Sequence, residues 1–254
     1  MKRTIIIGDV HGMAVELQSL LDKLAPNEND TFVFVGDLVD GGPESVEAVR
    51  MVRELSEKFD VVVLEGNHEA RHRKFRKKHT DAEVDDLAEK GHPRAVITKV
   101  LSEEDIAFMD SFVLFNKIEE HEILVVHGGI PGNMTKFPDT LAEIPSMSRK
   151  EQETFSKLIY TRRINAQTGG FLRLKEATEA DPFWADLYDG RFGHVVFGHQ
   201  PFVDGVRKFP HATGIDTGAV FGGSLTAMVL EGDNRTFVSV SSRGKYRNCL
   251  IKSS

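Results

Sequence analysis

The chain of 254 residues has little cysteine, no long apolar run and no signal-like start. Cys249 is the only cysteine, which excludes an intrachain disulfide and indicates a reducing compartment. No run of 18 apolar residues is present, and the start, MKRTIII, is too short for the apolar core of a signal peptide. We therefore expect a cytoplasmic protein that makes no use of a membrane.

The sequence also lacks the features that divide a chain into separate parts. No stretch is rich in Pro, Gly and Ser, none is of low complexity, and no repeat is visible. Hydrophobic residues make up 40% of the chain, which is enough for a sizeable core, and we expect one domain over residues 1–254. The formal net charge of −7 argues against a broad nucleic-acid-binding surface but permits local basic patches.

Apolar strands and amphipathic helices alternate in the first part of the sequence. Strands are expected at the starts of TIIIGDVHG (4–12), TFVFVGD (31–37) and DVVVLEGNHE (60–69). Helices are expected at 13–25, where apolar residues recur at helical spacing, and at 43–59. Such an alternation is typical of a largely parallel sheet covered by helices.

The rest of the chain changes character twice. Residues 70–111 are charged and helical in pattern, and strands return in EILVVHGGI (122–130) and HVVFGHQP (194–201). From about residue 202 the pattern is that of short strands, with two β-rich runs joined at 232–234 by Gly-Asp-Asn. The predicted fold class is α/β, a sandwich of two sheets with helices outside.

Five apolar strands each end in a short polar cluster: GDVHG (8–12), GDLVDGG (36–42), GNHE (66–69), HGG (127–129) and GHQ (198–200). One cluster alone is no more than a turn or loop, but sites form outside the carboxyl ends of strands in open α/β sheets. Imidazole, carboxylate and amide groups together suit a divalent ion such as Mn²⁺, Fe²⁺ or Zn²⁺. Two such ions that share a carboxylate and a hydroxide hydrolyse phosphate esters and anhydrides, so we predict a binuclear metal site.

These clusters, in this order, resemble those of the calcineurin-like metallophosphoesterase superfamily, in particular its phosphoprotein-phosphatase-type branch. GIDTGAVFGGSLTAMVLE (214–231) resembles the closing strands of that branch. DPFWADLYDGRFGHVVFGHQPF (181–202) is similar to bacterial enzymes like symmetrical diadenosine tetraphosphatase. The resemblance implies a four-layer fold of two mixed sheets face to face with helices on both sides.

The resemblance also implies a role for each polar residue in the clusters. Asp9 and His11 would bind one ion, Asp37 would bridge the two ions, and Asn67, His127 and His199 would bind the other. His68 would be the general acid, oriented by Asp40. The implied cofactor is two divalent ions, Mn²⁺ by preference, with Fe, Zn or Ni as alternatives.

The residues support this assignment on their own. Asp9 and His11 alternate with Val10, so in an extended segment their side chains share one face. Asn67 and His68 are adjacent and would point apart, one toward the ions and the other toward the leaving group. A metal-activated hydroxide would attack phosphorus in line, while the imidazolium supplies the proton that the leaving group needs.

The chain departs from the family at Gly41. The family commonly has an arginine directly after the second Asp of this motif, where it holds the substrate phosphate, but this chain reads VDGGPES. Glycine supplies no charge, so either the ions suffice or another arginine reaches the site. The segment YTRRIN offers Arg162 and Arg163, and we favour Arg162; the alternative is that both are exposed charges.

Several other residues are interpreted as structural. The basic run RHRKFRKKH (71–79) is assigned to a solvated helix face, partly neutralised by the acidic run at 81–89; the alternative is a patch that steers polyanions. Trp184 is assigned to packing in preference to base stacking. The histidines interpreted as surface or packing residues are His72, His79, His92, His121, His194 and His211.

Three functions compete at this point. The first is hydrolysis of dinucleoside polyphosphates or related nucleotides, supported by the resemblance over 160–202. The second is a phosphoprotein phosphatase acting on Ser/Thr or also Tyr, supported by the complete pair of Asp40 and His68. The third is a non-catalytic, metal-dependent binding protein, which is disfavoured because every ligand and the acid are present. The expected partner is therefore a phosphorylated small molecule or a phosphoprotein.

Overall fold

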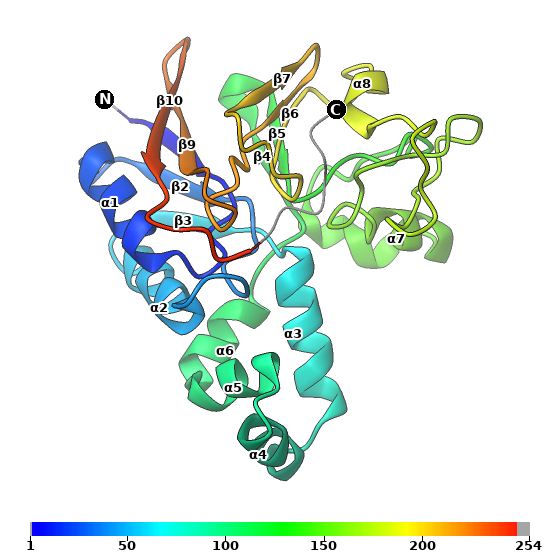
Figure 1. Ribbon diagram of the computed structural model, residues 1–254. Coiled ribbons are helices and arrows are strands. Elements are labelled where there is room, and N and C mark those ends of the chain that lie inside the picture. Colours follow the sequence, from blue (N-terminus) through cyan, green and yellow to red (C-terminus); the bar gives the residue numbers. More distant parts are fainter. Residues whose placement is uncertain (1, 248–254) are drawn as a thin grey trace.

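Two five-stranded mixed sheets lie face to face in the computed structural model, which describes residues 2–247 (Figure 1). Cys249 lies outside the described residues. The first sheet has the order β10-β9-β1-β2-β3, with strands Asn234–Ser241, Ser224–Glu231, Thr4–Ile7, Thr31–Phe34 and Asp60–Val63. The second has the order β4-β5-β6-β8-β7, with strands Phe115–Ile118, Ile123–Val126, His194–Phe197, Ala212–Gly214 and Arg207–Phe209. The predicted two-sheet α/β sandwich is confirmed.

Each sheet combines three parallel strands with two antiparallel strands; in the first sheet the parallel strands occupy one side, and in the second they occupy the centre. β1 pairs in parallel with β2, and β2 with β3, while β9 and β10 add to β1 as an antiparallel hairpin. In the second sheet, β5, β6 and β8 are parallel, and β4 and β7 are antiparallel to their neighbours. The carboxyl ends of β1, β2, β3, β5 and β6 are the five ends that carry the polar clusters.

The apolar runs are continuous because both faces of each central strand are buried. In β1, Ile5 and Ile7 face the helices of the first sheet, whereas Ile6 faces the second sheet. Val33 of β2 and Val196 of β6 lie in the same core between the sheets as Ile6. Alternate side chains along a strand point to opposite faces, so a strand covered on both sides needs an apolar residue at every position.

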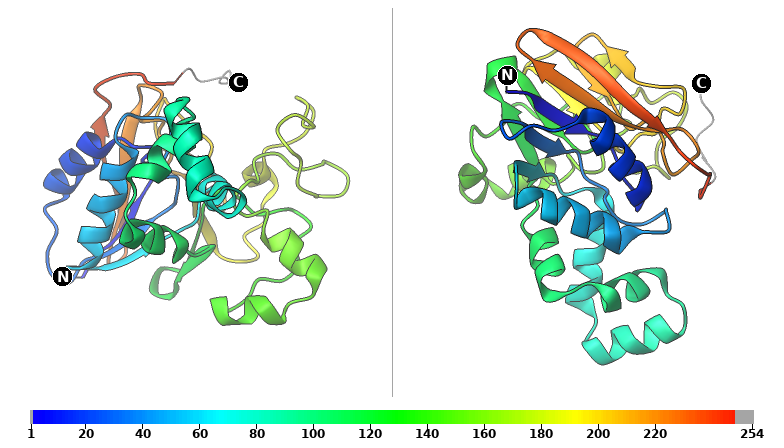
Figure 2. Two further views of the ribbon diagram at one scale, coloured as in Figure 1. Left: turned by 90° about the horizontal axis from the view of Figure 1, so that it is seen from below. Right: turned by 90° about the vertical axis from the view of Figure 1, so that its left-hand side faces the viewer.

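Helices and loops cover the outer face of each sheet (Figure 2). α1 (Ala14–Leu24) and α2 (Ser45–Ser56) pack on the first sheet, close to the predicted ranges. On the second sheet lie α7 (Arg149–Phe155), α8 (Trp184–Leu187) and the loops around them, with η1 (Glu119–His121) and η2 (Leu141–Ser146) as short 3₁₀ turns. The result is four layers.

The helical stretch predicted at 70–111 forms a projection beside the first sheet. α3 (Asn67–Lys78) extends away from the sheets, and α4 (Asp81–Glu89), α5 (Pro93–Val100) and α6 (Glu103–Asp110) follow it (Figure 1). Phe75, Val84 and Ala95 form a small core that holds α3, α4 and α5 together. Among residues 2–247, none of the helices combines the length and apolar character that crossing a bilayer needs.

Candidate metal centre and active site

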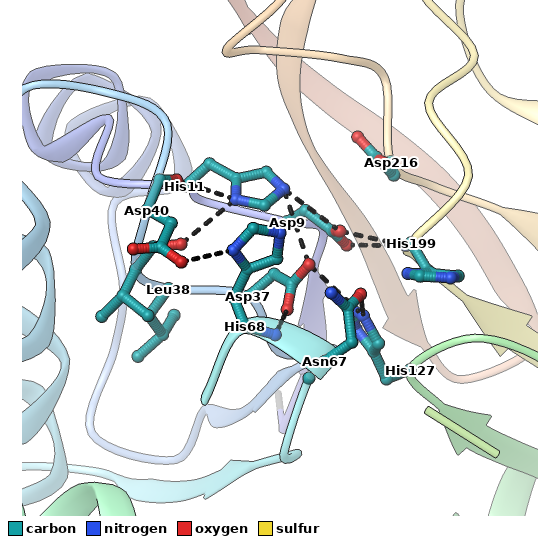
Figure 3. Close-up of polar contacts among 12 residues, drawn as sticks. Asp9, His11, Asp37, Leu38, Asp40, Asn67, His68, His127, His199 and Asp216 are labelled. Atoms are coloured by element: carbon teal, nitrogen blue, oxygen red, sulfur yellow. Dashed lines mark hydrogen bonds and ion pairs between the residues drawn. The ribbon is translucent and has the colours of Figure 1, made fainter. Parts of the chain in front are cut away.

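The five polar clusters meet where the parallel strands of both sheets end (Figure 3). The first sheet contributes three clusters after β1, β2 and β3, and the second sheet contributes two after β5 and β6. The structure therefore brings together residues that are up to 190 positions apart, as in the contact of the His199 backbone with Asp9. The eight side chains assigned from the sequence as metal ligands, acid or acid partner are all buried, with no more than 9% exposure: Asp9, His11, Asp37, Asp40, Asn67, His68, His127 and His199.

Asp37 lies at the middle of the cluster. One carboxylate oxygen, Oδ1, accepts a hydrogen bond of 2.9 Å from the backbone N–H of His68 at the start of α3. The other, Oδ2, lies 3.6 Å from Nε2 of His11 and 3.4 Å from Nε2 of His127. Asp37 thus belongs to both groups of side chains that could hold a cation, one with His11 and His68 and one with His127 and His199.

The histidines of the cluster are oriented by backbone carbonyls. Nδ1 of His11 lies 2.9 Å from the carbonyl oxygen of Asp40, and Nδ1 of His127 lies 2.8 Å from that of Val35. Each Nδ1–H therefore donates to a carbonyl, and Nε2 of both residues faces the carboxylate of Asp37. Such outer contacts fix the tautomer that a metal-binding histidine needs.

Burial favours the neutral imidazole in His11 and His199. It lowers the pKa of His11 to about 4, and it also lowers the pKa of His199 well below its usual value, with a further contribution from the charge of Arg162. Nδ1 of His199 is buried and, among residues 2–247, has no hydrogen-bond partner. A neutral, unpaired nitrogen in this position fits a ligand for a divalent ion.

Negative charge is concentrated around the same centre. Burial, together with the neighbouring carboxylates of Asp216 and Asp37, raises the pKa of Asp9 well above its usual range. Burial also raises the pKa of Asp216, to about 6. Buried carboxylates that repel one another are costly unless a cation compensates them, so this donor set fits divalent ions. The oxygen and imidazole ligands match the borderline metals expected from the sequence.

Asp40 contacts two histidines of α3. Nδ1 of His68 lies 2.6 Å from Oδ2 of Asp40, and Nε2 of His72 lies 2.9 Å from Oδ1 (Figure 3 shows the first contact). Although burial acts to raise the pKa of Asp40, the hydrogen bonds from His68 and His72 hold it well below its usual range. Asp40 is therefore ionised, and it directs Nε2 of His68 toward the cluster.

The place of His72 in the site corrects its interpretation from the sequence as a surface or packing residue. Its side chain is fully buried and serves as the second partner of Asp40. The spacing from His68 is four residues, which places both side chains on one face of a helix. That spacing is the signal by which the sequence could have revealed this role.

Glu69 is another residue whose role the sequence reasoning missed. Its carboxylate is buried and accepts hydrogen bonds from four backbone N–H groups, those of Asp37, Leu38, Val39 and Gly66. Glu69 therefore fixes the loop that carries both Asp37 and Asp40 to the start of α3. It is the third residue of α3, where an acidic side chain also completes the helix cap.

The backbone of the site is held in an unusual conformation. Four non-glycine residues have positive φ: His11 at 49°, Asp37 at 52°, Asp40 at 67° and His199 at 65°. Such conformations cost free energy and persist only where surrounding contacts enforce them. Here the N–H of His11 donates to the carbonyl of Asp37 over 2.7 Å, so the two strained loops support each other.

Two neighbouring arginines bear on the question raised by Gly41. Arg162 donates to the carbonyl of His199, and its charge interacts with Asp9, Asp37 and Asp216. The structure does not bring Arg163 to the cluster in the same way, because its guanidinium donates to the carbonyl of Asp181. This geometry favours Arg162 of the two, and the substrate-binding role of both stays a prediction.

Arg247 fills the space beside Gly41. A Cβ atom added to Gly41 would lie 3.0 Å from Nε and 3.2 Å from Cζ of Arg247. The backbone N–H of Arg247 donates to the carbonyl of Val220, which brings this C-terminal segment over the site, and the charge of Arg247 contributes to the lowered pKa of His11. The guanidinium of Arg247 therefore lies beside the position that the side chain of the family's arginine would occupy. Arg247 belongs to a segment in which the sequence shows no motif.

Trp184 is a packing residue, as expected. It is 1% exposed and lies directly under the HGG loop, where a Cβ on Gly129 would lie 2.2 Å from its Nε1. Gly129 is therefore required for the close approach of the loop that follows β5.

Comparisons with known proteins give matches that extend over most of the chain. A family model for calcineurin-like phosphoesterases matches residues 2–223. A protein of Halalkalibacterium halodurans named bis(5′-nucleosyl)-tetraphosphatase PrpE (asymmetrical) is 32% identical over 268 residues, covering 96% of this chain and 97% of the relative. A protein of the same name from Oceanobacillus iheyensis is 29% identical over 257 residues, covering 94% and 92%. A solved structure provisionally described as a diadenosine tetraphosphatase superposes with a TM-score of 0.70 at 26% identity and covers 95% of both chains.

Proposed function

Because this chain belongs to the calcineurin-like phosphoesterase family, we propose that it hydrolyses dinucleoside polyphosphates or related nucleotides at a dinuclear metal centre. Two relatives that align along nearly their whole length are named as tetraphosphatases of bis(5′-nucleosyl) compounds, which supports this substrate class. The main observation that supports the mechanism is the position of Asp37 Oδ2, which lies between Nε2 of His11 and Nε2 of His127. A carboxylate so placed can contact two ions at once.

Members of this family use two divalent metal ions, and the His and Asp groups described above can bind metal. We assign one ion to Asp9 and His11, the other to Asn67, His127 and His199, and the bridge to Asp37. Mn²⁺ is the proposed metal, because the ligands combine imidazole with carboxylate and amide oxygen. When bound, the two ions supply Lewis-acid activation of water and neutralise charge on the substrate phosphate.

His68 supplies the proton for the leaving group. Asp40 accepts from Nδ1 of His68, which directs Nε2 toward the reacting centre. His72 holds the second oxygen of Asp40, so the carboxylate cannot rotate away. A positioned acid of this kind contributes typically 10²–10⁴-fold to the rate. His68 also belongs to one of the two possible cation groups, so the metal content of a His68→Asn variant distinguishes an acid from a ligand.

Two guanidinium groups hold the substrate phosphate in this proposal. Arg162 approaches from the side of the second sheet, and Arg247 takes the place beside Gly41. Both lie close enough to the buried carboxylates or to His11 to influence their charge. They would stabilise negative charge that the ions leave uncompensated.

A substrate panel tests the proposal. Purified protein with Mn²⁺ is given diadenosine tetraphosphate, mononucleotides, phosphopeptides and p-nitrophenyl phosphate, and kcat/KM is compared. The proposal expects the highest value for diadenosine tetraphosphate and no turnover after chelation, with recovery when Mn²⁺ is added. A higher value for phosphopeptides would favour a phosphoprotein phosphatase instead. Turnover that survives complete metal removal would contradict the dinuclear mechanism.

A further inference from the structure

The basic helix α3 has two faces with different surroundings. Arg73 forms an ion pair of 2.9 Å with Glu65, and Arg76 pairs with Asp110. These two cations are therefore neutralised by acidic residues outside the helix. Arg71, Lys74 and Lys78 lie on another face of the helix.

A second set of cations follows His68 along α3. Arg71, Lys74 and Lys78 lie three, six and ten residues after His68, a spacing that keeps side chains on one helix face. At a rise of about 1.5 Å per residue, this stripe runs for about 15 Å from the general acid. All three cations are exposed, whereas His68 is buried at the head of the stripe.

The acidic helix α4 forms no ion pair within 4.0 Å with this stripe among the described residues. Its carboxylates pair with other lysines: Asp85 with Lys99 at 2.9 Å and Asp86 with Lys90 at 2.5 Å. Within the part of the chain that the structure describes, Arg71, Lys74 and Lys78 form no ion pair within 4.0 Å. The expectation that the 81–89 segment offsets the basic run holds for Glu83, which lies 3.9 Å from His79 and also feels the charge of Lys78 at longer range.

The stripe borders a pocket between α3 and α5. The pocket has a volume of about 410 Å³, and its lining includes Arg71, Lys74, Lys78 and Arg94, together with the rings of Phe75 and His92, which stack on one another.

Two arginines that line the pocket also lie close to the acid of the active site and its partner. The guanidinium of Arg71 lies 3.4 Å from Nε2 of His68. Nε of Arg94 lies 3.9 Å from Asp40 and, among the described residues, is buried without a hydrogen-bond partner. Both arginines therefore stand at the boundary between the catalytic cluster and the pocket.

We propose that this α3–α5 pocket binds the leaving group of the substrate, and that the leaving group is a nucleoside polyphosphate. A general acid lies beside the oxygen that departs, so the groups directly beyond His68 face the leaving side of the substrate. Four cations along one pocket match a chain of several phosphates, and the neighbouring rings suit the attached nucleoside. This assignment rests on the proposed function. It adds the orientation of the substrate, with the attacked phosphate at the metal centre and the departing polyphosphate in the α3–α5 pocket.

The direction determines which bond is cleaved. The oxygen of water forms a bond to the phosphorus held at the metal centre, and the bond from that phosphorus to the bridging oxygen of the departing chain breaks. The bridging oxygen keeps the electron pair and takes the proton from Nε2 of His68. With a dinucleoside tetraphosphate, a nucleoside triphosphate in the pocket leaves a nucleoside monophosphate as the second product, which agrees with the asymmetrical cleavage in the names of the two relatives.

Inhibition by products tests the pocket without depending on the natural substrate. Hydrolysis of p-nitrophenyl phosphate is measured with ATP, AMP or inorganic phosphate as inhibitor, with Mn²⁺ kept in excess over nucleotide. Inorganic phosphate needs only the metal centre, so the ratio of the inhibition constants for ATP and phosphate reports on the pocket. Lys74→Gln and Lys78→Gln are compared with Lys77→Gln, an exposed lysine of the same helix that does not line the pocket.

The proposal expects ATP to inhibit more strongly than AMP in the wild type. Lys74→Gln and Lys78→Gln should each weaken inhibition by ATP, relative to phosphate, by roughly fivefold at low salt, the order expected for one partly exposed charge contact. Raising the salt concentration should reduce this difference, and Lys77→Gln should leave the ratio unchanged.

Equal ratios in all three variants and the wild type would overturn the pocket assignment, as would an equal effect of Lys77→Gln. Failure of the wild type to hydrolyse diadenosine tetraphosphate is a separate result, which contradicts the proposed substrate. Hydrolysis that yields two nucleoside diphosphates would overturn the proposed direction of the substrate, because the departing chain would then be shorter.

Discussion

Glu69→Ala should destabilise the protein strongly, because one carboxylate holds the site loop together. The four backbone N–H groups that it satisfies lie 2.9, 2.8, 3.3 and 2.9 Å from its oxygens and belong to Asp37, Leu38, Val39 and Gly66. Each buried donor left without a partner costs about 1–3 kcal/mol. Water that enters the vacated space would replace some of these bonds. We therefore expect the free energy of unfolding to fall by about 3–5 kcal/mol in total.

Glu16→Ala is the matched control for this prediction. Glu16 is also buried, at 3% exposure, but it accepts from a single backbone N–H, that of Arg243, over 2.8 Å. Glu16→Ala should therefore lower the free energy of unfolding by about 1–3 kcal/mol. If the Glu69 carboxylate acts through its four bonds, the free energy of unfolding of Glu69→Ala should be lower than that of Glu16→Ala by at least about 1 kcal/mol.

The free energy of unfolding is measured by urea denaturation with a chelator present, because bound metal would add stability to the folded state only. A second readout is metal affinity, which should fall by about 10–100-fold in Glu69→Ala, as is usual when a group that orients a ligand is removed. A Glu69→Ala protein no less stable than Glu16→Ala would refute the reasoning. So would an unchanged metal affinity, because Asp37 would then keep its place without Glu69.

Four other substitutions probe the site and its surroundings. Asp37→Asn should abolish hydrolysis and lower the metal content of the purified protein; full metal content with full activity would rule out the bridge. His68→Asn should keep its metal and lose roughly 10²–10⁴-fold in turnover, with a smaller loss for p-nitrophenyl phosphate, whose leaving group needs a proton less. Loss of metal in that variant would make His68 a ligand. Gly41→Arg should raise KM and lower the melting temperature. The φ angle of Gly41 is 106°, and a Cβ there would lie 3.0 Å from Arg247. A lower KM would show that the new guanidinium replaces Arg247 without strain. Burial lowers the pKa of His194 from 6.5 to about 4, so the unfolded chain takes up a proton first and stability should fall as pH drops from 6.5 toward 4. His194→Gln should make urea unfolding less sensitive to pH over this range, and an identical pH profile would contradict that cause.

The fold and the metal cluster could be predicted because their signals are local. Each polar cluster directly follows its apolar strand, and parallel strands bring their carboxyl ends to one edge of a sheet. The alternation of strand and helix then determines that Asp9, Asp37 and Asn67 meet at the first sheet. The continuous apolar runs further indicate that both faces of these strands are covered. None of these inferences requires knowledge of contacts between distant segments.

The sequence by itself thus determined the two-sheet architecture and the residues that gather at its strand ends. Only the tertiary structure decided that Arg247 lies beside Gly41, that His72 supports Asp40, and that α4 leaves the α3 stripe without ion pairs among the described residues. The physical reason is that periodicity states which residues share a face but not what packs against that face. Ion pairs and hydrogen bonds between distant segments depend on how the layers pack, and no local pattern records that packing.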